Sequence, residues 1–263
     1  MQLTTNLSEP LLELIREDQA PIDAVEVGPW FSAPQIRDYR QMLPDLPFYF
    51  HGGDLIDGVG LIPGAVSRIA AYQRCTGSSW VSMHITLWLP GMVGLMLRRG
   101  WRMPLPNPER ATGRFIRQVR RLARSLPVPV LLENTEPLPF EGYDFEVQPE
   151  RITQVLEGAE CGFVLDISHA RVSAAALDVD PYDYLSALPL HRVLQLHVSG
   201  PRMRQGCLVD VHESMQELDY EFLDFVLERA QPQVVTLEYI RAREALQEQL
   251  IRLRGMLDAQ AQP

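Results

Sequence analysis

Short apolar runs alternate along the chain with longer stretches in which apolar residues recur every three or four positions. The short runs are rich in β-branched residues, which favours strands, and the longer stretches have the period of helices with one buried face. The predicted strands are residues 2–7, 24–28, 48–52, 80–88, 128–135, 162–168, 192–200 and 234–240. The predicted helices are residues 8–18, 32–43, 64–75, 107–126, 148–160, 180–188, 220–230 and 243–257.

Strand and helix alternate eight times, which is typical of repeated βα units on a parallel sheet. Several helical stretches begin with Ser, Asn or Asp followed by Pro or an acidic residue, as helix starts commonly do. Eight units predict a single-domain (β/α)8 TIM barrel, with residues 1–257 as the catalytic domain and 258–263 as a flexible tail. An open doubly wound sheet is the alternative, but no glycine-rich phosphate loop follows any predicted strand.

Polar side chains that can bind metal ions gather at the carboxyl ends of the predicted strands, where a TIM barrel places its active site. The candidate ligands are His51, His84, Glu133, Asp166, His169, His197, Asp210, His212 and Glu238. One histidine in an apolar strand is more often a hydrogen-bonded core residue than a ligand. Five of the six histidines lie at these ends or in the loop that follows, however, so the whole set indicates a metal centre. His191 precedes its strand, and we assign it a structural role at the opposite face.

Nine nitrogen and oxygen ligands exceed the need of one ion, because a catalytic zinc or non-haem iron uses about three protein ligands. The sequence therefore predicts two or three ions. Glu133 lies near the middle of the set and has two oxygens, which makes it the candidate to bridge two ions. No thiolate joins the set, which favours iron, manganese or zinc over a structural zinc site.

The spacing of two ligand pairs makes a geometric prediction. Strict strand alternation would point Asp166 and His169 to opposite faces, so the strand must end near Ile167 and turn if both are to reach one pocket. Asp210 and His212 are two apart, and in an extended segment their side chains point the same way.

Each of the other polar or aromatic residues near the mouth of the barrel has two alternative roles. Glu26 on the second strand is either a site residue or a hydrogen-bonding core residue. Trp30 and Trp88 either line the pocket or simply pack at its rim. Arg202 and Arg204 either hold an anionic substrate group through bidentate hydrogen bonds or belong to a solvent-exposed loop.

The composition narrows the classes of partner. The formal net charge of -10 argues against nucleic acid, which is normally bound by a basic surface. The basic run at residues 114–124 mixes arginine with apolar residues at helical spacing and predicts a solvated helix face. All 24 basic residues are arginine, so lysine Schiff-base chemistry is excluded.

Neither a targeting segment nor a membrane span is expected. The first residues lack a basic region followed by a long apolar run, and no apolar stretch approaches the roughly 18 residues of a transmembrane helix. We therefore expect a cytoplasmic protein without a membrane partner. Cys75, Cys161 and Cys207 are too few and too irregularly spaced for a disulfide framework, and we expect reduced thiols.

Six stretches follow one another in a distinctive order: VSMHITLW, LLENTE, LDISHARVSA, DYLSALPLHRVLQLHVSG, LVDVHES and VVTLEYI. Their joint order resembles the DUF692 family, the multinuclear non-haem iron-dependent oxidative enzymes (MNIO), and the likeness covers most of residues 48–240. That family is related to the methanobactin biosynthesis oxidase and belongs to the xylose isomerase-like TIM-barrel superfamily. The resemblance implies two or three irons, as Fe(II) and Fe(III), that use dioxygen to modify cysteine-containing ribosomal precursor peptides (RiPP biosynthesis), with or without a separate recognition protein. It also implies that the ligands are His51, His84, Glu133, Asp166, His197, Asp210, His212 and Glu238.

The chain departs from that family's pattern in three places. The family usually has Asp-Val-Asn-Asn where this chain has Asp166-Ile167-Ser168-His169, so a histidine replaces a common asparagine. A second histidine after the seventh strand is Pro201 here, and a Gly- and Ser-rich stretch after the first histidine is GGDLIDG. These differences leave the choice of peptide open.

Three alternatives remain at this point. Endonuclease IV-type enzymes bind three zincs through the same nine residue types in this chain order, and His169 completes that match, but the acidic charge and the absence of their DNA-binding motifs oppose it. Sugar isomerases and epimerases place Glu, Asp, His and Glu at strand ends, generally with fewer histidines. A metal-dependent barrel that only binds a peptide is the non-enzymatic alternative.

Overall fold

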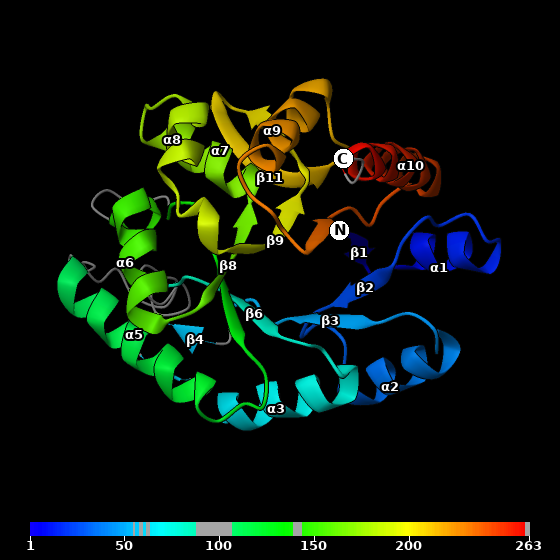
Figure 1. Ribbon diagram of the computed structural model, residues 1–263, viewed down its shortest axis with the longest axis horizontal. Coiled ribbons are helices and arrows are strands. Elements are labelled where there is room, and N and C mark those ends of the chain that lie inside the picture. Colours follow the sequence, from blue (N-terminus) through cyan, green and yellow to red (C-terminus); the bar gives the residue numbers. More distant parts are fainter. Residues whose placement is uncertain (55, 58–59, 62–63, 88–106, 139–143, 261–263) are drawn as a thin grey trace.

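The computed structural model describes residues 1–54, 56–57, 60–61, 64–87, 107–138 and 144–260. Eight parallel strands close into a barrel in chain order. They are β1 (Gln2–Asn6), β2 (Ala24–Val27), β3 (Phe48–His51), β6 (Val81–His84), β7 (Val130–Glu133), β8 (Gly162–Asp166), β9 (Val193–Val198) and β12 (Val234–Leu237). Figure 1 shows these strands at the centre of the molecule with the helices around them. The predicted single-domain (β/α)8 barrel is confirmed.

The predicted helices are present in the ring around the barrel. The described helices are α1 (Glu9–Arg16), α2 (Ala33–Met42), α3 (Ala65–Thr76), α5 (Pro108–Ala123), α6 (Pro149–Ala159), α7 (Ile167–Ala176), α8 (Pro181–Ala187), α9 (Glu217–Leu227) and α10 (Arg243–Gln260), with short 3-10 turns at Asp144–Val147 and Leu190–Arg192. Side chains of Ser8, Ser32, Asn107 and Asp180 cap α1, α2, α5 and α8. Each accepts a hydrogen bond from a backbone N–H of the first turn, as the sequence predicted.

The basic run forms the outer part of α5, as predicted. Phe115, Val119 and Leu122 on this helix are fully buried, whereas Arg117 and Arg121 are exposed. The described helices include none that is long and apolar enough to cross a membrane. Cys75, Cys161 and Cys207 are free thiols.

Several elements differ from the sequence prediction. The helix α7 follows β8 without a loop, and we did not predict it because it is buried almost all round and has no polar face to give a helical period. Two antiparallel hairpins, β4 (Ile56–Asp57) with β5 (Gly60–Leu61) and β10 (Gly200–Arg204) with β11 (Cys207–Glu213), lie outside the barrel.

Two predicted boundaries run differently in the structure. The strand predicted at 80–88 is regular only over β6, and its last residue, Trp88, lies outside the described residues. Helix α10 continues to Gln260, so the first part of the predicted tail is helical, while residues 261–263 lie outside the described residues. The domain boundary at 257 stays a prediction.

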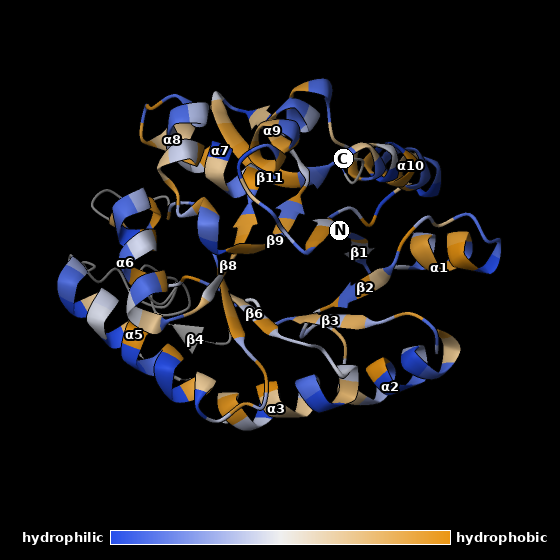
Figure 2. Ribbon diagram, viewed as in Figure 1, coloured by the Kyte–Doolittle hydropathy of each residue, from blue (hydrophilic) through white to orange (hydrophobic). Residues whose placement is uncertain are grey.

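The core has an outer and an inner part. The larger cluster packs between the strands and the helices, and Figure 2 shows the strands coloured mainly as hydrophobic and the helices carrying both colours. The smaller cluster lies at the amino end of the strands and contains Ala24, Tyr49, Trp80, Leu131, Val164 and Val234. Because strand side chains alternate between faces, the residues two positions further along these strands also point inward.

Candidate metal centre

Every second residue of a strand points into the barrel, and along several strands these inward residues change from apolar to polar. On β3, His51 follows Tyr49, and on β7, Glu133 follows Leu131. Asp166 on β8 likewise lies two positions after Val164, whereas His84 and Glu238 lie four positions after Trp80 and Val234. With His197, these residues stand at the carboxyl end of the barrel. Neighbouring strands set these residues side by side, since His84 is in register with Glu133 and Asp166 with His197.

Glu133 lies at the centre of the cluster, and its two oxygens contact different histidines. Its Oε2 lies 3.4 Å from Nδ1 of His51 and 3.8 Å from Nε2 of His84. Its Oε1 lies 3.3 Å from Nδ1 of His197 and 3.6 Å from Nδ1 of His169. A carboxylate with a pair of histidines at each oxygen has the geometry of a bridging ligand.

Asp166 and His169 reach the same site because the strand ends where the sequence required. Strand β8 ends at Asp166, which then caps α7 by accepting a hydrogen bond of 2.7 Å from the backbone N–H of His169. The first helical turn brings the His169 ring back over the barrel mouth, with Nδ1 3.7 Å from Asp166 Oδ2 and Nε2 3.5 Å from Asp210 Oδ2. His169 is therefore turned toward the other candidate ligands.

The β10–β11 hairpin supplies the two candidates that follow the seventh strand of the barrel. Asp210 accepts a hydrogen bond of 2.7 Å from Ser199, and its backbone N–H donates to Glu136. His212 has a left-handed backbone, with φ of 48°, that directs its ring back to the mouth. Its Nε2 lies 2.9 Å from Glu238 Oε2 and 3.4 Å from Asp210 Oδ2.

Three groups of side chains have ligand atoms within 4.8 Å of one another, which is close enough for a shared ion. The groups are His51, Glu133 and His197; Glu26, His197 and Glu238; and Glu133, Asp166 and His169. Glu133 and His197 each belong to two groups. The three predicted ligands outside these groups contact members of them: His84 lies 3.8 Å from Glu133, Asp210 3.5 Å from His169 and His212 2.9 Å from Glu238. All nine predicted ligands therefore lie in one cluster.

The chemistry of the site fits metal ions. Four buried atoms of the candidate ligands have no hydrogen-bond partner among the described residues: Glu133 Oε2, Asp166 Oδ2, His197 Nδ1 and Asp210 Oδ2. Each buried polar atom left without a partner costs on the order of 1–3 kcal/mol, which a bound cation would offset. The donors are nitrogen and oxygen without sulfur, a set suited to hard or borderline ions.

Mutual interaction of acids and histidines shifts their protonation. Burial disfavours the charge on His169, but Asp166 and Glu133 raise its pKa to about 9. Burial also disfavours the charge on His212, but the hydrogen bond with Glu238 raises its pKa to about 9. Burial also acts to raise the pKa of Glu238, yet the nearby histidines lower it to about 2. Most of the site is therefore charged when no metal is bound.

Two members differ from this pattern. Burial raises the pKa of Asp166 to about 7, against the attraction of His169. Burial lowers the pKa of His51, and Glu133 only partly opposes it. Burial therefore favours the neutral form at both His51 and Asp166.

Glu26 belongs to the layer directly below the site. Its Oε2 lies 3.3 Å from His197 Nε2 and accepts a hydrogen bond of 2.7 Å from Gln195. Asn6 donates to its other oxygen at 3.2 Å. With Nε2 facing Glu26, His197 turns Nδ1 toward Glu133 and Glu238, so Glu26 orients the ring.

Sequence reasoning missed Asp54, Asn134 and Arg241. Asp54 Oδ1 lies 2.9 Å from His84 Nδ1, which leaves Nε2 of that ring facing the site. Asn134 exchanges two hydrogen bonds of 2.9 Å with the backbone of Asp166 and locks neighbouring strands together. The resemblance to LLENTE contained Asn134, but no pattern in the sequence indicated its partner.

A cavity of about 660 Å³ opens above the cluster. Besides candidate ligands, it is lined by Asn6, Leu7, Trp30, Ile240 and Arg241. Arg241 is held by Glu213 at 2.9 Å and by the carbonyl of Val211 at 2.7 Å. Of the two alternatives that the sequence left open for Trp30, the structure shows the one in which it lines the cavity.

The structure does not bring every predicted residue to the cavity. Arg202 donates to the carbonyls of Pro201 and Ser214, and Arg204 lies 3.7 Å from Glu213, so both contact their own hairpin. Trp88 is outside the described residues. His191 lies before β9, at the other end of the strand from His197, as predicted.

The fold and the side chains at its mouth define a TIM barrel with a candidate metal centre. Solved structures with a similar fold are barrels of several activities. A D-tagatose 3-epimerase-like protein superposes with a TM-score of 0.65 at 16% identity, covering 98% of both chains. Endonuclease IV from Thermus thermophilus gives a TM-score of 0.62 at 21% identity, covering 98% of this chain and 100% of the other. These likenesses show the fold.

Sequence comparison identifies the family. The chain belongs to the family of RiPP precursor modification enzymes MbnB/TglH/ChrH, whose sequence model matches residues 5–254. A UPF0276 protein of Anaeromyxobacter sp. (strain Fw109-5) is 30% identical over 209 residues, covering 74% of this chain and 69% of the relative. One from Caulobacter vibrioides (strain NA1000 / CB15N) is 31% identical over 171 residues, covering 64% of this chain and 59% of the relative. The resemblance found in the motifs is confirmed.

Proposed function

We propose that the protein is a multinuclear iron-dependent oxidative enzyme that uses dioxygen to modify a cysteine-containing ribosomal precursor peptide. The observation that carries the proposal is the convergence of nine side chains with nitrogen or oxygen donors, His169 included, in a chain of a family of peptide-modifying enzymes. About three protein ligands for each ion correspond to two or three irons.

The residues would have different roles in the site. Glu133 would bridge two ions, with His51 and His84 on one side of it and His169 and His197 on the other. The remaining candidates, Asp166, Asp210, His212 and Glu238, would complete the ligand set. When bound, iron supplies electrons for the reduction of dioxygen and an open position for a substrate thiolate.

The protein around the cluster would bind the peptide and exclude water. Leu7, Trp30 and Ile240 give the cavity an apolar wall beside the charged floor. Arg241 stands at the same cavity and can donate to a peptide carbonyl or carboxylate with the N–H groups that Glu213 and Val211 leave free. A cavity of about 660 Å³ has room for a few residues of an extended peptide.

The decisive experiment combines metal analysis with a reaction. Protein purified without oxygen should contain about two to three irons per chain. A short cysteine-containing peptide encoded next to the gene should then change mass only when dioxygen is supplied, and its Cys→Ser counterpart should not change.

The same preparation tests the alternatives. Stoichiometric zinc together with cleavage of abasic DNA would replace the proposal by a three-metal phosphodiesterase, which the presence of His169 in the cluster favours as the second candidate. Sugar epimerisation with manganese or cobalt and without oxygen uptake would replace it by an isomerase. Peptide binding without any change in peptide mass would indicate a binding protein.

A further inference from the structure

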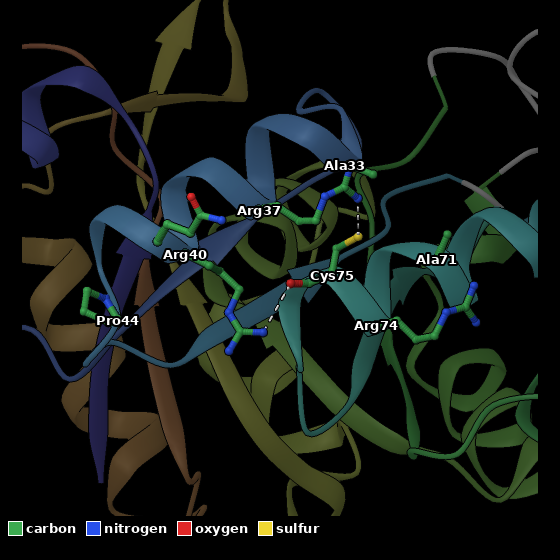
Figure 3. Close-up of a pocket in the computed structure, with 8 residues that line it drawn as sticks. Ala33, Arg37, Arg40, Pro44, Ala71, Arg74 and Cys75 are labelled. Atoms are coloured by element: carbon green, nitrogen blue, oxygen red, sulfur yellow. Dashed lines mark hydrogen bonds between the residues drawn. The ribbon is translucent and has the colours of Figure 1, made fainter.

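A basic groove lies outside the barrel between α2 and α3, away from the metal centre. It encloses about 670 Å³ and is lined by Arg37 and Arg40 of α2 and by Arg74 and Cys75 of α3, with alanines on both helices. Figure 3 shows Arg37 and Arg40 reaching from α2 to Cys75. We refer to this feature as the arginine groove.

The three arginines of the groove have unused hydrogen-bonding capacity. Arg37 Nη1 donates to Cys75 Sγ at 3.5 Å, and Arg40 Nη1 donates to the carbonyl of Cys75 at 3.3 Å. Within the described part of the chain, none of the three forms an ion pair, and no carboxylate lines the groove. Since a guanidinium has five N–H donors, most remain available to a ligand.

This arrangement is unusual in a chain with a net charge of -10. Many other arginines pair with a carboxylate, as Arg243 does with Glu17 and Arg252 with Glu217. The other basic hollow, on α5, is formed by that helix alone and includes Glu109, which pairs with Arg151 at 2.9 Å. The arginine groove differs because two helices form its walls and its charge is of one sign.

The groove begins beside the mouth of the metal cavity. Ala33, at its head, comes three residues after Trp30, which lines the metal cavity and is 57% exposed. Both follow β2, whose carboxyl end faces that mouth. From there α2 leads away over about 15 Å, which an extended peptide covers in roughly four or five residues.

The spacing of the arginines suits an extended acidic peptide. Arg37 and Arg40 are three apart on a helix, so they lie on one face about 5–6 Å from each other. Alternate residues of an extended chain project on the same side at about 6.6 Å. Carboxylates on alternate residues would therefore meet successive guanidiniums, and each can accept two parallel N–H donors.

We propose that the arginine groove binds an acidic stretch of the peptide whose cysteine is modified at the metal centre. This inference rests on the proposed function and extends it, because it assigns a chemical property to the substrate and a second contact site. The metal cavity would hold the reacting residue while the groove would hold a neighbouring acidic segment.

Binding of a defined probe tests the inference. The probe is a fluorescein-labelled synthetic peptide with glutamate at alternate positions, and the reference is the same peptide with glutamine. Fluorescence anisotropy should show that the glutamate peptide binds more tightly and that its affinity falls as salt rises from about 50 to 300 mM, since exposed charges are screened.

Matched variants locate the binding. Arg37→Gln/Arg40→Gln/Arg74→Gln should weaken the glutamate peptide about tenfold. The control Arg114→Gln/Arg117→Gln/Arg121→Gln removes the same charge from α5 and should change affinity less than about twofold. Arg37→Lys/Arg40→Lys/Arg74→Lys keeps the charge but loses the paired N–H donors, so it should restore only part of the affinity. Equal weakening by both triple variants, or equal binding of the two peptides, would overturn the inference.

The outcome is separable from that of the proposed function. Iron content and dioxygen-dependent peptide modification are measured on the same variants. If the groove binds the probe but the protein neither holds iron nor consumes oxygen, the proposed function fails. If oxidation proceeds while the groove variant has unchanged affinity for the probe, the inference about the groove is wrong.

Discussion

The two ends of the barrel interior are built by the same strands yet carry opposite chemistry. Tyr49 on β3 and Leu131 on β7 belong to the apolar cluster. The next inward-facing residues of these strands, two positions further on, are His51 and Glu133. That step is about 7 Å, the repeat of a strand. The comparison shows that a barrel can keep packing and chemistry in separate layers without a second domain.

A polar layer joins the two ends. Gln195 accepts a hydrogen bond from Trp80 of the apolar layer at 3.0 Å and donates to Glu26 at 2.7 Å and to Thr236 at 2.8 Å. Glu26 in turn contacts His197 of the metal layer. The layer of candidate ligands at the carboxyl ends of the strands, the metal layer, is therefore hydrogen-bonded to the residues below it. A substitution among those residues should change metal affinity through the orientation of His197.

The largest effects should come from paired substitutions on β7, two residues apart. Glu133→Gln removes the central carboxylate with little change of volume, and we expect the loss of at least one bound ion per chain and of all detectable oxidation. Leu131→Ala leaves a cavity in the apolar layer, and we expect the free energy of unfolding to fall by about 2–5 kcal/mol while metal content is kept. Metal analysis and denaturant unfolding of both variants distinguish the two layers. If the single substitution Leu131→Ala also removed metal, the apolar layer and the metal layer would not be separate.

The sequence could predict the barrel because its signal is repeated. Eight runs of apolar residues and eight amphipathic stretches each provided a weak indication, and their alternation provided a strong one. The convergence of the candidate ligands was also predictable, since His51, Glu133 and Asp166 end such runs and the carboxyl ends of parallel strands meet at one mouth.

What escaped prediction depends on contacts distant in sequence. Helix α7 is covered on nearly every side, so its residues show no polar face. Asp54 acts on His84 through a bend that no periodicity describes. The arginine groove needs α2 and α3 to be adjacent, because neither Arg37 nor Arg74 is distinguished within its own helix.

A smaller effect should follow from the support below the metals. Glu26→Gln keeps the shape of the side chain but removes the charge facing His197 Nε2, and we expect metal affinity to fall about 10–100-fold. Thr112→Val is the control, because Thr112 is buried on α5, outside the barrel, and its hydroxyl donates to the carbonyl of Pro108 at 2.8 Å. Competition with a chromophoric chelator measures both. Equal affinity of Glu26→Gln and the unaltered protein would show that packing alone orients His197.

The finest effect should be a release of protons when metal binds. Without metal, His169 and His212 have pKa values raised to about 9, so both are protonated near neutral pH, and metal binding must displace those protons. Glu238, with a pKa lowered to about 2, is already ionised and releases none. Metal affinity should therefore rise with pH between about 7 and 9, and the number of protons released should fall over the same range, because the histidines lose them beforehand. Titration calorimetry with Zn²⁺ in buffers of different ionisation enthalpy counts these protons. An observed enthalpy independent of the buffer would show that His169 and His212 bind no proton that the metal must displace, and the carboxylates would then carry the charge of this layer without balancing imidazolium groups at those two positions.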